Sequence, residues 1–408
     1  MSDFLISNNP FLLTSNVCTC EDENIEDFIR HTNPSGYSKM EFVSYDKFKD
    51  VEFISEGGFS KIYKATWING PRNWSAPLHY RIGNMTVALK ELNNSNSKEL
   101  KELKIFYNYA TSDGYAYDDH SNYISKYFGV TRHPFTQNFM IITKYYELGD
   151  LTNYISNNFY NTSWFNKLIE LQYIMSGLKN MHDADIIHKD YHSGNILLTT
   201  SKIPIVGDLG LNKSALSDND NEIYGIYSFG MIMWELMTGR RPFWNQNHNT
   251  DLIIEIWDGL RPPIVTNAPE GYIELMKECW HPDSNKRPTV SNLQLKVRAI
   301  WENEIKNNSY KNPTEIIKSS DIGPITTNNP GAIYKSRPLS AMIKSAKSTV
   351  NLRSQNNISK IVKNDKRKFD DDLIEDNNKN DKNFKKIKLL ENEKNGYSME
   401  LDIDIYLL

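Results

Sequence analysis

The sequence predicts an α+β protein built from two unlike lobes, a small β-rich lobe followed by a larger helical lobe. From Phe48 to about Trp301, segments rich in β-formers and punctuated by turns come first, and helical segments with apolar periodicity come later. The chain has 408 residues, enough for one large domain with extensions, because single hydrophobic cores stop growing near about 250–300 residues. After Glu302 the composition shifts to Asn, Lys, Ser and Asp with few aromatic residues, which is typical of a segment without a core.

These shifts divide the chain into three parts. We expect residues 1–45 to form a flexible leader, residues 46–301 the folded domain and residues 302–408 a disordered tail. Two basic clusters, at residues 366–368 and 385–388, lie in the tail on either side of an acidic run. We interpret them as part of a solvated polyampholyte, with a nuclear-import signal as the alternative.

Charge and cysteine content narrow the class of protein. The 47 basic residues are balanced by 51 acidic ones, which gives no global argument for nucleic acid or an anionic membrane as a partner. The three cysteines are too few for a disulfide framework and indicate a reducing compartment. The most apolar stretch, Ile226 to Met237, is shorter than the roughly 20 residues that span a bilayer. We therefore expect a cytoplasmic protein without a membrane span, and a buried core helix at this stretch.

The first stretch with chemical meaning is a small-residue turn between two β-type runs, from Ile54 to Tyr63. Its residues Gly57 and Gly58 would let backbone N–H groups approach phosphates closely. Taken alone, the pattern is a weak signal, because an ordinary β-hairpin with a glycine-containing turn is common.

A lysine on a buried strand follows about thirty residues later, in the stretch Val87-Ala88-Leu89-Lys90. Such a lysine needs an anionic partner, because desolvation would otherwise remove its charge. The natural partners are ATP phosphates and a carboxylate from the helix predicted at residues 96–109. We favour Glu102 for this ion pair, with Glu99 as the second choice; the alternative for either is a solvated helical carboxylate.

The most specific stretch runs from Ile187 to Leu197 and is followed by Val206 to Gly210. It holds Asp190, then Asn195 five residues later, and Asp208 on a following turn. This spacing supplies one base for a hydroxyl proton and two oxygen ligands for Mg²⁺.

In this order, the four motifs resemble the glycine-rich loop, V-A-I-K strand, H-R-D-x-x-x-x-N loop and D-F-G turn of the eukaryotic protein kinase family. The resemblance covers about residues 45–300 and implies a two-lobed protein kinase-like fold with ATP and Mg²⁺ as cofactors. The pair Cys279-Trp280, followed by Lys286-Arg287-Pro288, resembles the end of the tyrosine kinase and tyrosine-kinase-like branches, and we favour the latter.

The resemblance also assigns the nucleotide site. Ile62 and Ala88 would sandwich the adenine, Thr143 would take the gatekeeper position, and backbone groups of the hinge would bind the adenine edge. The full set of predicted nucleotide-binding residues is Ile54, Gly57, Gly58, Ile62, Ala88, Lys90, Thr143, Lys144 and Tyr146.

The catalytic roles follow in the same way. Lys90 would hold the α- and β-phosphates with Glu102 as its ion-pair partner. Asn195 and Asp208 would hold Mg²⁺, and Asp190 would accept the substrate proton.

Several positions depart from the family pattern. The glycine loop has Ser55 and Ser60 at its first and third glycine places, and Lys189 replaces the arginine of H-R-D, without the bidentate fork of a guanidinium. His192 stands where serine/threonine kinases usually carry a lysine that touches the γ-phosphate, and no arginine follows at Gly194. The site therefore lacks one full positive charge.

The largest departure follows Gly210, because the chain passes directly through Tyr224-Gly225 into the long central helix of the family. By this resemblance, about two dozen residues that would carry the substrate-docking loop and the A-P-E motif are missing near positions 225–226. Gly225 stands where the family has a helix-capping Asp, and Arg287 is retained without its A-P-E glutamate. We expect this arginine to reach solvent or another acid.

The sequence thus predicts a protein kinase that transfers the γ-phosphate of MgATP to hydroxyls of protein substrates or signalling partners, with transfer impaired by the missing segment. The alternative is a non-catalytic pseudokinase that binds ATP or acts as a scaffold. A small-molecule phosphotransferase is disfavoured by the Cys279-to-Pro288 pattern. Serine/threonine against tyrosine specificity and the oligomeric state are left open.

Overall fold

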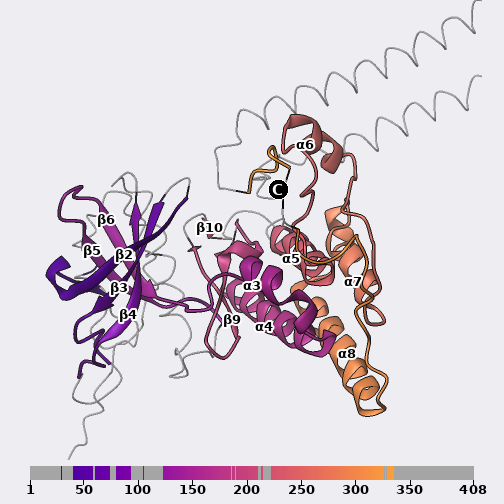
Figure 1. Ribbon diagram of the computed structural model, residues 1–408, viewed down its shortest axis with the longest axis horizontal. Coiled ribbons are helices and arrows are strands. Elements are labelled where there is room, and N and C mark those ends of the chain that lie inside the picture. The colour runs from indigo at the N-terminus through magenta and orange to yellow at the C-terminus, as the bar shows by residue number, and fades with distance from the viewer. Residues whose placement is uncertain are drawn as a thin grey trace, which may run out of the picture.

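The computed structural model describes residues 29, 40–57, 60–73, 80–92, 104, 123–184, 186–188, 190–209, 213–214, 222–325, 327 and 329–334. Within them, a small β-rich lobe is followed by a larger helical lobe, which confirms the predicted fold class (Figure 1). None of the helices in these ranges is both long and apolar enough to cross a bilayer.

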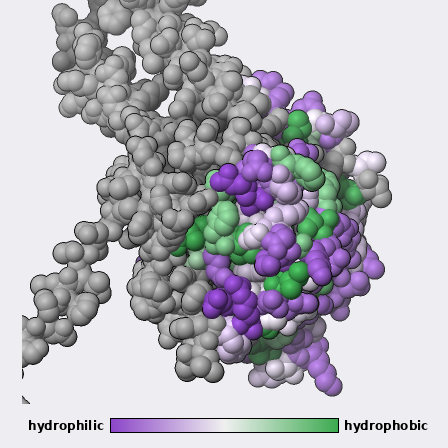
Figure 2. All heavy atoms as spheres, turned by 90° about the vertical axis from the view of Figure 1, so that its left-hand side faces the viewer, coloured by the Kyte–Doolittle hydropathy of each residue, from purple (hydrophilic) through white to green (hydrophobic). Residues whose placement is uncertain are grey.

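The small lobe is a six-stranded sheet in the order β1-β5-β6-β4-β3-β2, antiparallel except where β1 runs parallel to β5. Its core lies on one face, where Trp67, Val87 and Leu89 pack together. The outer surface of this lobe mixes hydrophilic and hydrophobic residues (Figure 2). The strands are β1 Glu41–Phe42, β2 Phe48–Glu56, β3 Ser60–Trp67, β4 Met85–Leu92, β5 Tyr127–Arg132 and β6 Phe139–Lys144.

The large lobe is organised around α5 (Glu222–Thr238), whose apolar residues from Ile226 onward are buried as predicted for a core helix. Helices α4 (Trp164–Asp183) and α7 (Tyr272–Cys279) pack against it. Most helices of this lobe begin at a side chain that caps the first turn, such as Asp150 or Thr289. These helices are α3 Leu151–Asn158, α4 Trp164–Asp183, α6 Thr250–Trp257, α7 Tyr272–Cys279 and α8 Val290–Ser309. Four short strands line the junction with the small lobe: β7 Ile186–Ile187, β8 Ile196–Leu198, β9 Pro204–Val206 and β10 Lys213–Ser214.

The folded unit begins earlier than the predicted residue 46. Met40 and Val43 are buried, and the intervening strand β1 pairs with β5. The pairing depends on Gly129, which has φ 143° and whose Cβ, if present, would lie 1.9 Å from the Glu41 carbonyl oxygen. The leader prediction is therefore corrected to a start near residue 40, while most of the leader lies outside the described residues.

The folded unit also ends later than the predicted residue 301. Helix α8 continues to Ser309, and residues 310–325, 327 and 329–334, here called the C-terminal strap, run back over the large lobe (orange in Figure 1). Buried Glu304 accepts hydrogen bonds from the backbone N–H and the hydroxyl of Thr314, at 2.9 and 2.8 Å. These contacts turn the chain where the composition predicted disorder, and residues 335–408 with their basic clusters lie outside the described part.

Arg240 fastens the middle of the strap to the end of α5. Its guanidinium donates to the carbonyl oxygens of Ser320, Ile322 and Gly323, and the N–H of Gly323 donates to Thr238 O at 2.7 Å. These three carbonyl oxygens of the strap are therefore hydrogen-bonded without regular secondary structure.

The far end of the strap lies against the loop before α6. The Tyr334 hydroxyl donates to Pro242 O at 2.7 Å, and the guanidinium of Arg241 lies 3.9 Å from the centre of the Tyr334 ring. His248 donates its backbone N–H to Gly331 O at 2.8 Å. The strap therefore joins α8, α5 and the approach to α6.

Replacing Ile322 with Ala should lower the free energy of unfolding by about 2–5 kcal/mol, because a buried isoleucine would leave a cavity. Ile322 is 3% exposed and belongs to the main hydrophobic core. Ile317, five residues earlier in the same strap, is 64% exposed and provides the matched control, since its replacement by Ala should change stability by less than about 0.5 kcal/mol. Denaturant melts of the full chain measure both, and equal values would contradict a docked strap.

Candidate active site

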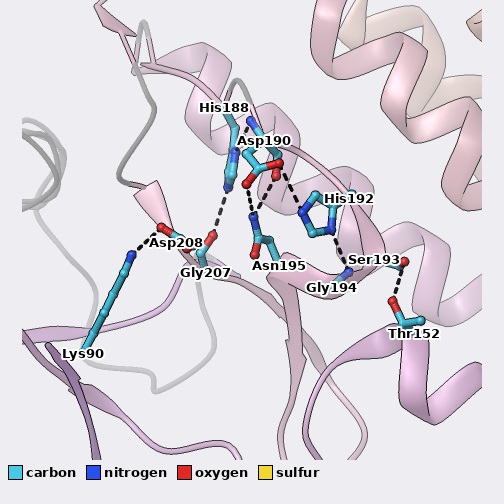
Figure 3. A network of polar contacts seen from close by, with 10 residues as sticks. All are labelled: Lys90, Thr152, His188, Asp190, His192, Ser193, Gly194, Asn195, Gly207 and Asp208. Atoms are coloured by element: carbon cyan, nitrogen blue, oxygen red, sulfur yellow. Dashed lines mark hydrogen bonds and ion pairs between the residues drawn. The ribbon is translucent and has the colours of Figure 1, made fainter. Parts of the chain in front are cut away.

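The two lobes meet through an ion pair between Lys90 and Asp208. Lys90 extends from β4, and its Nζ lies 2.6 Å from Oδ1 of Asp208, which follows β9 (Figure 3). Asp208 has φ 54°, a left-handed conformation that turns the backbone sharply out of the strand. Two residues predicted to act on the same phosphates are thus brought together, 118 positions apart in the sequence.

Asn195 and Asp190 form the second half of the site. The side-chain amide of Asn195 donates to Asp190 O at 2.9 Å and to Asp190 Oδ2 at 3.1 Å. Since Nδ2 faces Asp190, the carbonyl Oδ1 of Asn195 is the atom available to a metal ion. Short turn η3 (Ser193–Asn195) holds the amide in this position.

His188 ties the loop of Asp190 to the turn of Asp208. Its Nδ1 accepts the backbone N–H of Asp190 at 3.2 Å, so the ring proton is on Nε2, which donates to Gly207 O at 2.9 Å. Burial lowers the pKa of His188 below its ordinary value, which keeps the ring neutral. The sequence motif contains this histidine, but its bond to Gly207 depends on tertiary contact and could not be read from the motif.

Asp190 itself is 4% exposed and lies beside His192. His192 Nε2 is 3.1 Å from Asp190 Oδ1, while His192 Nδ1 accepts the Gly194 N–H at 3.0 Å. Asp190 Oδ1 makes no aligned hydrogen bond within the described residues. A carboxylate oxygen without an aligned hydrogen bond is suited to take a proton from a hydroxyl.

The strand register places the predicted adenine residues opposite one another. Ile62 pairs with Lys90, and Ala88 pairs with Thr143, so these side chains share the sheet face opposite the buried Val87 and Leu89.

The rest of the predicted nucleotide site is only partly described. Ile54 is exposed near the end of β2, and the N–H of Gly57 closes the turn onto Ser60 O at 2.8 Å. Lys144 donates its backbone N–H to Lys126 O at 3.2 Å, so an adenine contact from Lys144 would use its carbonyl. Tyr146 follows in the hinge and is buried. Gly58, Glu102 and Glu99 lie outside the described residues, and the predicted Lys90–Glu102 pair stays a prediction.

The donor set fits Mg²⁺ rather than a transition metal. In the described part of the chain, no group of three or more His, Cys, Asp and Glu side chains is placed to bind a metal ion. Asp208 and Asn195 instead offer two hard oxygen atoms, and Mg²⁺ in nucleotide sites is held by one or two carboxylates together with substrate phosphates.

The start of the core helix α5 lies beside a buried histidine, His182. The Cβ of a side chain at Gly225, inside α5, would lie 3.2 Å from Nε2 of His182. Both ring nitrogens of His182 are buried and have no hydrogen-bond partner among the described residues, and burial lowers its pKa to about 4. A carboxylate at position 225 would lie beside the His182 imidazole, which has no such partner among the described residues.

Arg287 has found partners of a kind that the sequence did not predict. Its Nε donates to His281 O at 2.9 Å, and its guanidinium lies 5.1 Å from the centre of the Tyr227 ring. Arg261 lies at the same distance from that ring. The expectation that Arg287 reaches solvent or another acid stays a prediction, and the structure adds a carbonyl oxygen and an aromatic face to its surroundings.

A β-rich lobe and a helical lobe, with Lys90, Asp208, Asn195 and Asp190 meeting between them, define a protein kinase domain. The family model described as protein tyrosine and serine/threonine kinase matches residues 48–224 and 224–297. The chain therefore belongs to the protein tyrosine and serine/threonine kinase family, which confirms the resemblance.

Curated relatives come from both sides of this family. A protein of Acanthamoeba polyphaga mimivirus, named as a serine/threonine-protein kinase/receptor, is 26% identical over 274 residues, covering 62% of this chain and 15% of the relative. Ephrin type-B receptor 1-A of Xenopus laevis is 26% identical over 295 residues, covering 65% of this chain and 28% of the receptor. Ephrin type-A receptor 5 of Gallus gallus is 29% identical over 197 residues, covering 42% and 19%. The chain thus spans less than a third of the length of these relatives, and the mixture of names fits the tyrosine-kinase-like branch.

Proposed function

We propose that this chain binds MgATP between its lobes and transfers the γ-phosphoryl group to a hydroxyl acceptor. The observation that carries the proposal is the meeting of Lys90, Asp208, Asn195 and Asp190 from three separate sequence motifs. Their types match the parts of phosphoryl transfer: a cation for phosphates, two oxygen ligands for a metal and a base.

Each residue has a task that its geometry supports. Lys90 Nζ holds the α- and β-phosphates. To do so, it would give up its ion pair with the Asp208 carboxylate, which now lies 2.6 Å away. Asp208 and the carbonyl oxygen of Asn195 hold Mg²⁺, which supplies charge neutralisation at the phosphates. Asp190 takes the proton of the attacking hydroxyl through Oδ1, while its other oxygen is fixed by Asn195.

Protein substrates are the acceptors we propose, with transfer to them weakened by a missing docking segment. Two matched stretches of the family model meet at residue 224, which supports an interruption at the predicted position. Without a docking surface, a peptide is poorly held in near-attack geometry, so rates should fall below the roughly 1–100 s⁻¹ of kinases.

Replacing Lys90 with Met should weaken MgATP binding by at least about tenfold, because the lysine supplies the charge that faces the phosphates. Isothermal titration of the full chain with MgATP measures this. Lys49, an exposed lysine on β2, provides the control, since Lys49→Met removes the same charge away from the site. Equal affinities of the wild type and Lys90→Met would overturn the site assignment.

A second candidate function is a scaffold that binds nucleotide without transferring phosphate. His182 beside Gly225 favours it, because its ring has no hydrogen-bond partner among the described residues and Gly225 offers no side chain to bind it. Calorimetry and assays of ATP hydrolysis and peptide phosphorylation, run in parallel, separate the two. Binding without any turnover would support the scaffold.

A further inference from the structure

We propose that His192 is a positioning residue for Asp190, and that Gly194 provides the space its imidazole needs. The inference rests on the proposed phosphoryl transfer and deepens it, by naming what orients the base in a site that lacks the usual lysine. It is carried by the contacts of one histidine ring with two neighbouring residues, Asp190 and Gly194 (Figure 3).

The two nitrogens of His192 have different partners. Nδ1 accepts the backbone N–H of Gly194 at 3.0 Å, so this nitrogen carries no proton. The hydrogen of the ring is therefore on Nε2, which lies 3.1 Å from Oδ1 of Asp190. A small tilt of the ring would align this N–H with the carboxylate.

Asp190 is consequently approached from both sides. Asn195 Nδ2 donates to Oδ2, and His192 Nε2 faces Oδ1, the oxygen without another aligned donor among the described residues. With the ring aligned, donors at both oxygens would give the carboxylate one orientation, which a base must keep relative to the attacking hydroxyl. The His192 side chain is 26% exposed.

Gly194 is needed for a steric reason. A Cβ at this position would lie 2.8 Å from Cε1 and 3.0 Å from Nδ1 of His192. Any larger residue would push the imidazole away from the loop and change its approach to Asp190. The two departures from the family pattern, His192 and Gly194, are therefore one paired feature.

A simpler role for His192 is to cap the short turn η3 through Nδ1. Substitutions separate the roles, because the Asn side chain can replace the Nδ1 acceptor but falls short of Asp190, whereas the Gln amide nitrogen reaches the place of Nε2. Positioning predicts that His192→Gln keeps kcat for MgATP hydrolysis within about threefold and that His192→Asn lowers it about tenfold, with KM unchanged in both.

Gly194→Ala tests the same feature while leaving His192 in place. Alone, it should lower kcat several-fold, whereas in a His192→Ala chain it should have little further effect, because the displaced ring is already gone. Thermal melts of all variants identify any that fail to fold, and only folded variants are compared.

The outcomes distinguish the two proposals. A wild-type chain that neither binds nor hydrolyses MgATP overturns the proposed function, and this inference with it. An active wild type in which His192→Asn equals or exceeds His192→Gln, or in which the Gly194→Ala effect persists without the imidazole, overturns the positioning role alone. The order Gln above Asn, together with non-additive loss in the double variant, supports it.

Discussion

Replacing Asp190 with Asn should lower the rate of MgATP hydrolysis by about 10²–10⁴-fold, while MgATP affinity stays nearly unchanged. Asn has the same shape as Asp, and its amide oxygen can still accept the hydrogen bond from Asn195, but the amide cannot take up a proton. Asp190 is buried and is not part of the Lys90–Asp208 ion pair that we assign to the phosphates. Its charge should therefore contribute little to nucleotide binding. Hydrolysis is the appropriate assay because water needs no peptide-docking surface.

Asp208→Asn provides the matched comparison for this variant. It removes one carboxylate of the same site, but from the residue assigned to Mg²⁺ and paired with Lys90, so it should raise the Kd for MgATP. Calorimetry and steady-state hydrolysis of both variants give the two constants. If Asp190→Asn hydrolyses MgATP as fast as the wild type, Asp190 is not the base.

Replacing Gly225 with Asp should raise the pKa of His182 by about 1–3 units, because a carboxylate would then stand beside a buried imidazole. In the wild type, burial lowers this pKa to about 4 from an ordinary 6.5. The new Cβ would approach Leu178 Cδ1 to 2.7 Å, a contact with the end of a flexible side chain that can shift. Histidine NMR titration measures the pKa directly.

The change in pKa also changes how stability depends on pH. A histidine whose folded pKa is depressed contributes its full stability above pH 6.5 and loses it as the pH falls toward about 4, a loss of about 3 kcal/mol for wild-type His182. Gly225→Asp should therefore flatten the decline in Tm between these values. Gly225→Asn has the same size without the charge and should retain the acid sensitivity; an identical pH profile for Asp and Asn would contradict the pairing.

The predictable part of this site consists of residues within short motifs. Lys90, Asp190, Asn195 and Asp208 could be assigned because their neighbours in the sequence fix their strand or turn, and the two lobes then bring them together. The contact of His192 with Asp190 also lies within one motif, yet it depends on a rotamer and on the absence of a side chain at Gly194. A motif gives residue types, but it does not give ring orientations.

Contacts between distant segments were the part that could not be predicted. Composition averaged over residues 302–408 is polar and concealed Ile322, one apolar residue that enters the core and anchors its neighbours. The contacts of Arg287 with Tyr227 and with the carbonyl of His281 are apparent only once the helices are packed. Such pairings depend on tertiary geometry, which local patterns leave undetermined.

The strap also has a consequence for the order of events during synthesis. The hydroxyl of Tyr334 donates a hydrogen bond to Pro242 O, 92 positions earlier, and Ile322 packs into a core otherwise built from residues that precede it in the sequence. While the ribosome is still translating residues 240–320, the nascent large lobe has an apolar gap that its own chain cannot yet fill. Domains generally fold as units from the N-terminus, and transiently exposed apolar surface invites aggregation or chaperone binding. We therefore expect the large lobe to complete its packing only after residue 334 has left the ribosome. Pauses in translation before that point should prolong the exposure of apolar surface to chaperones.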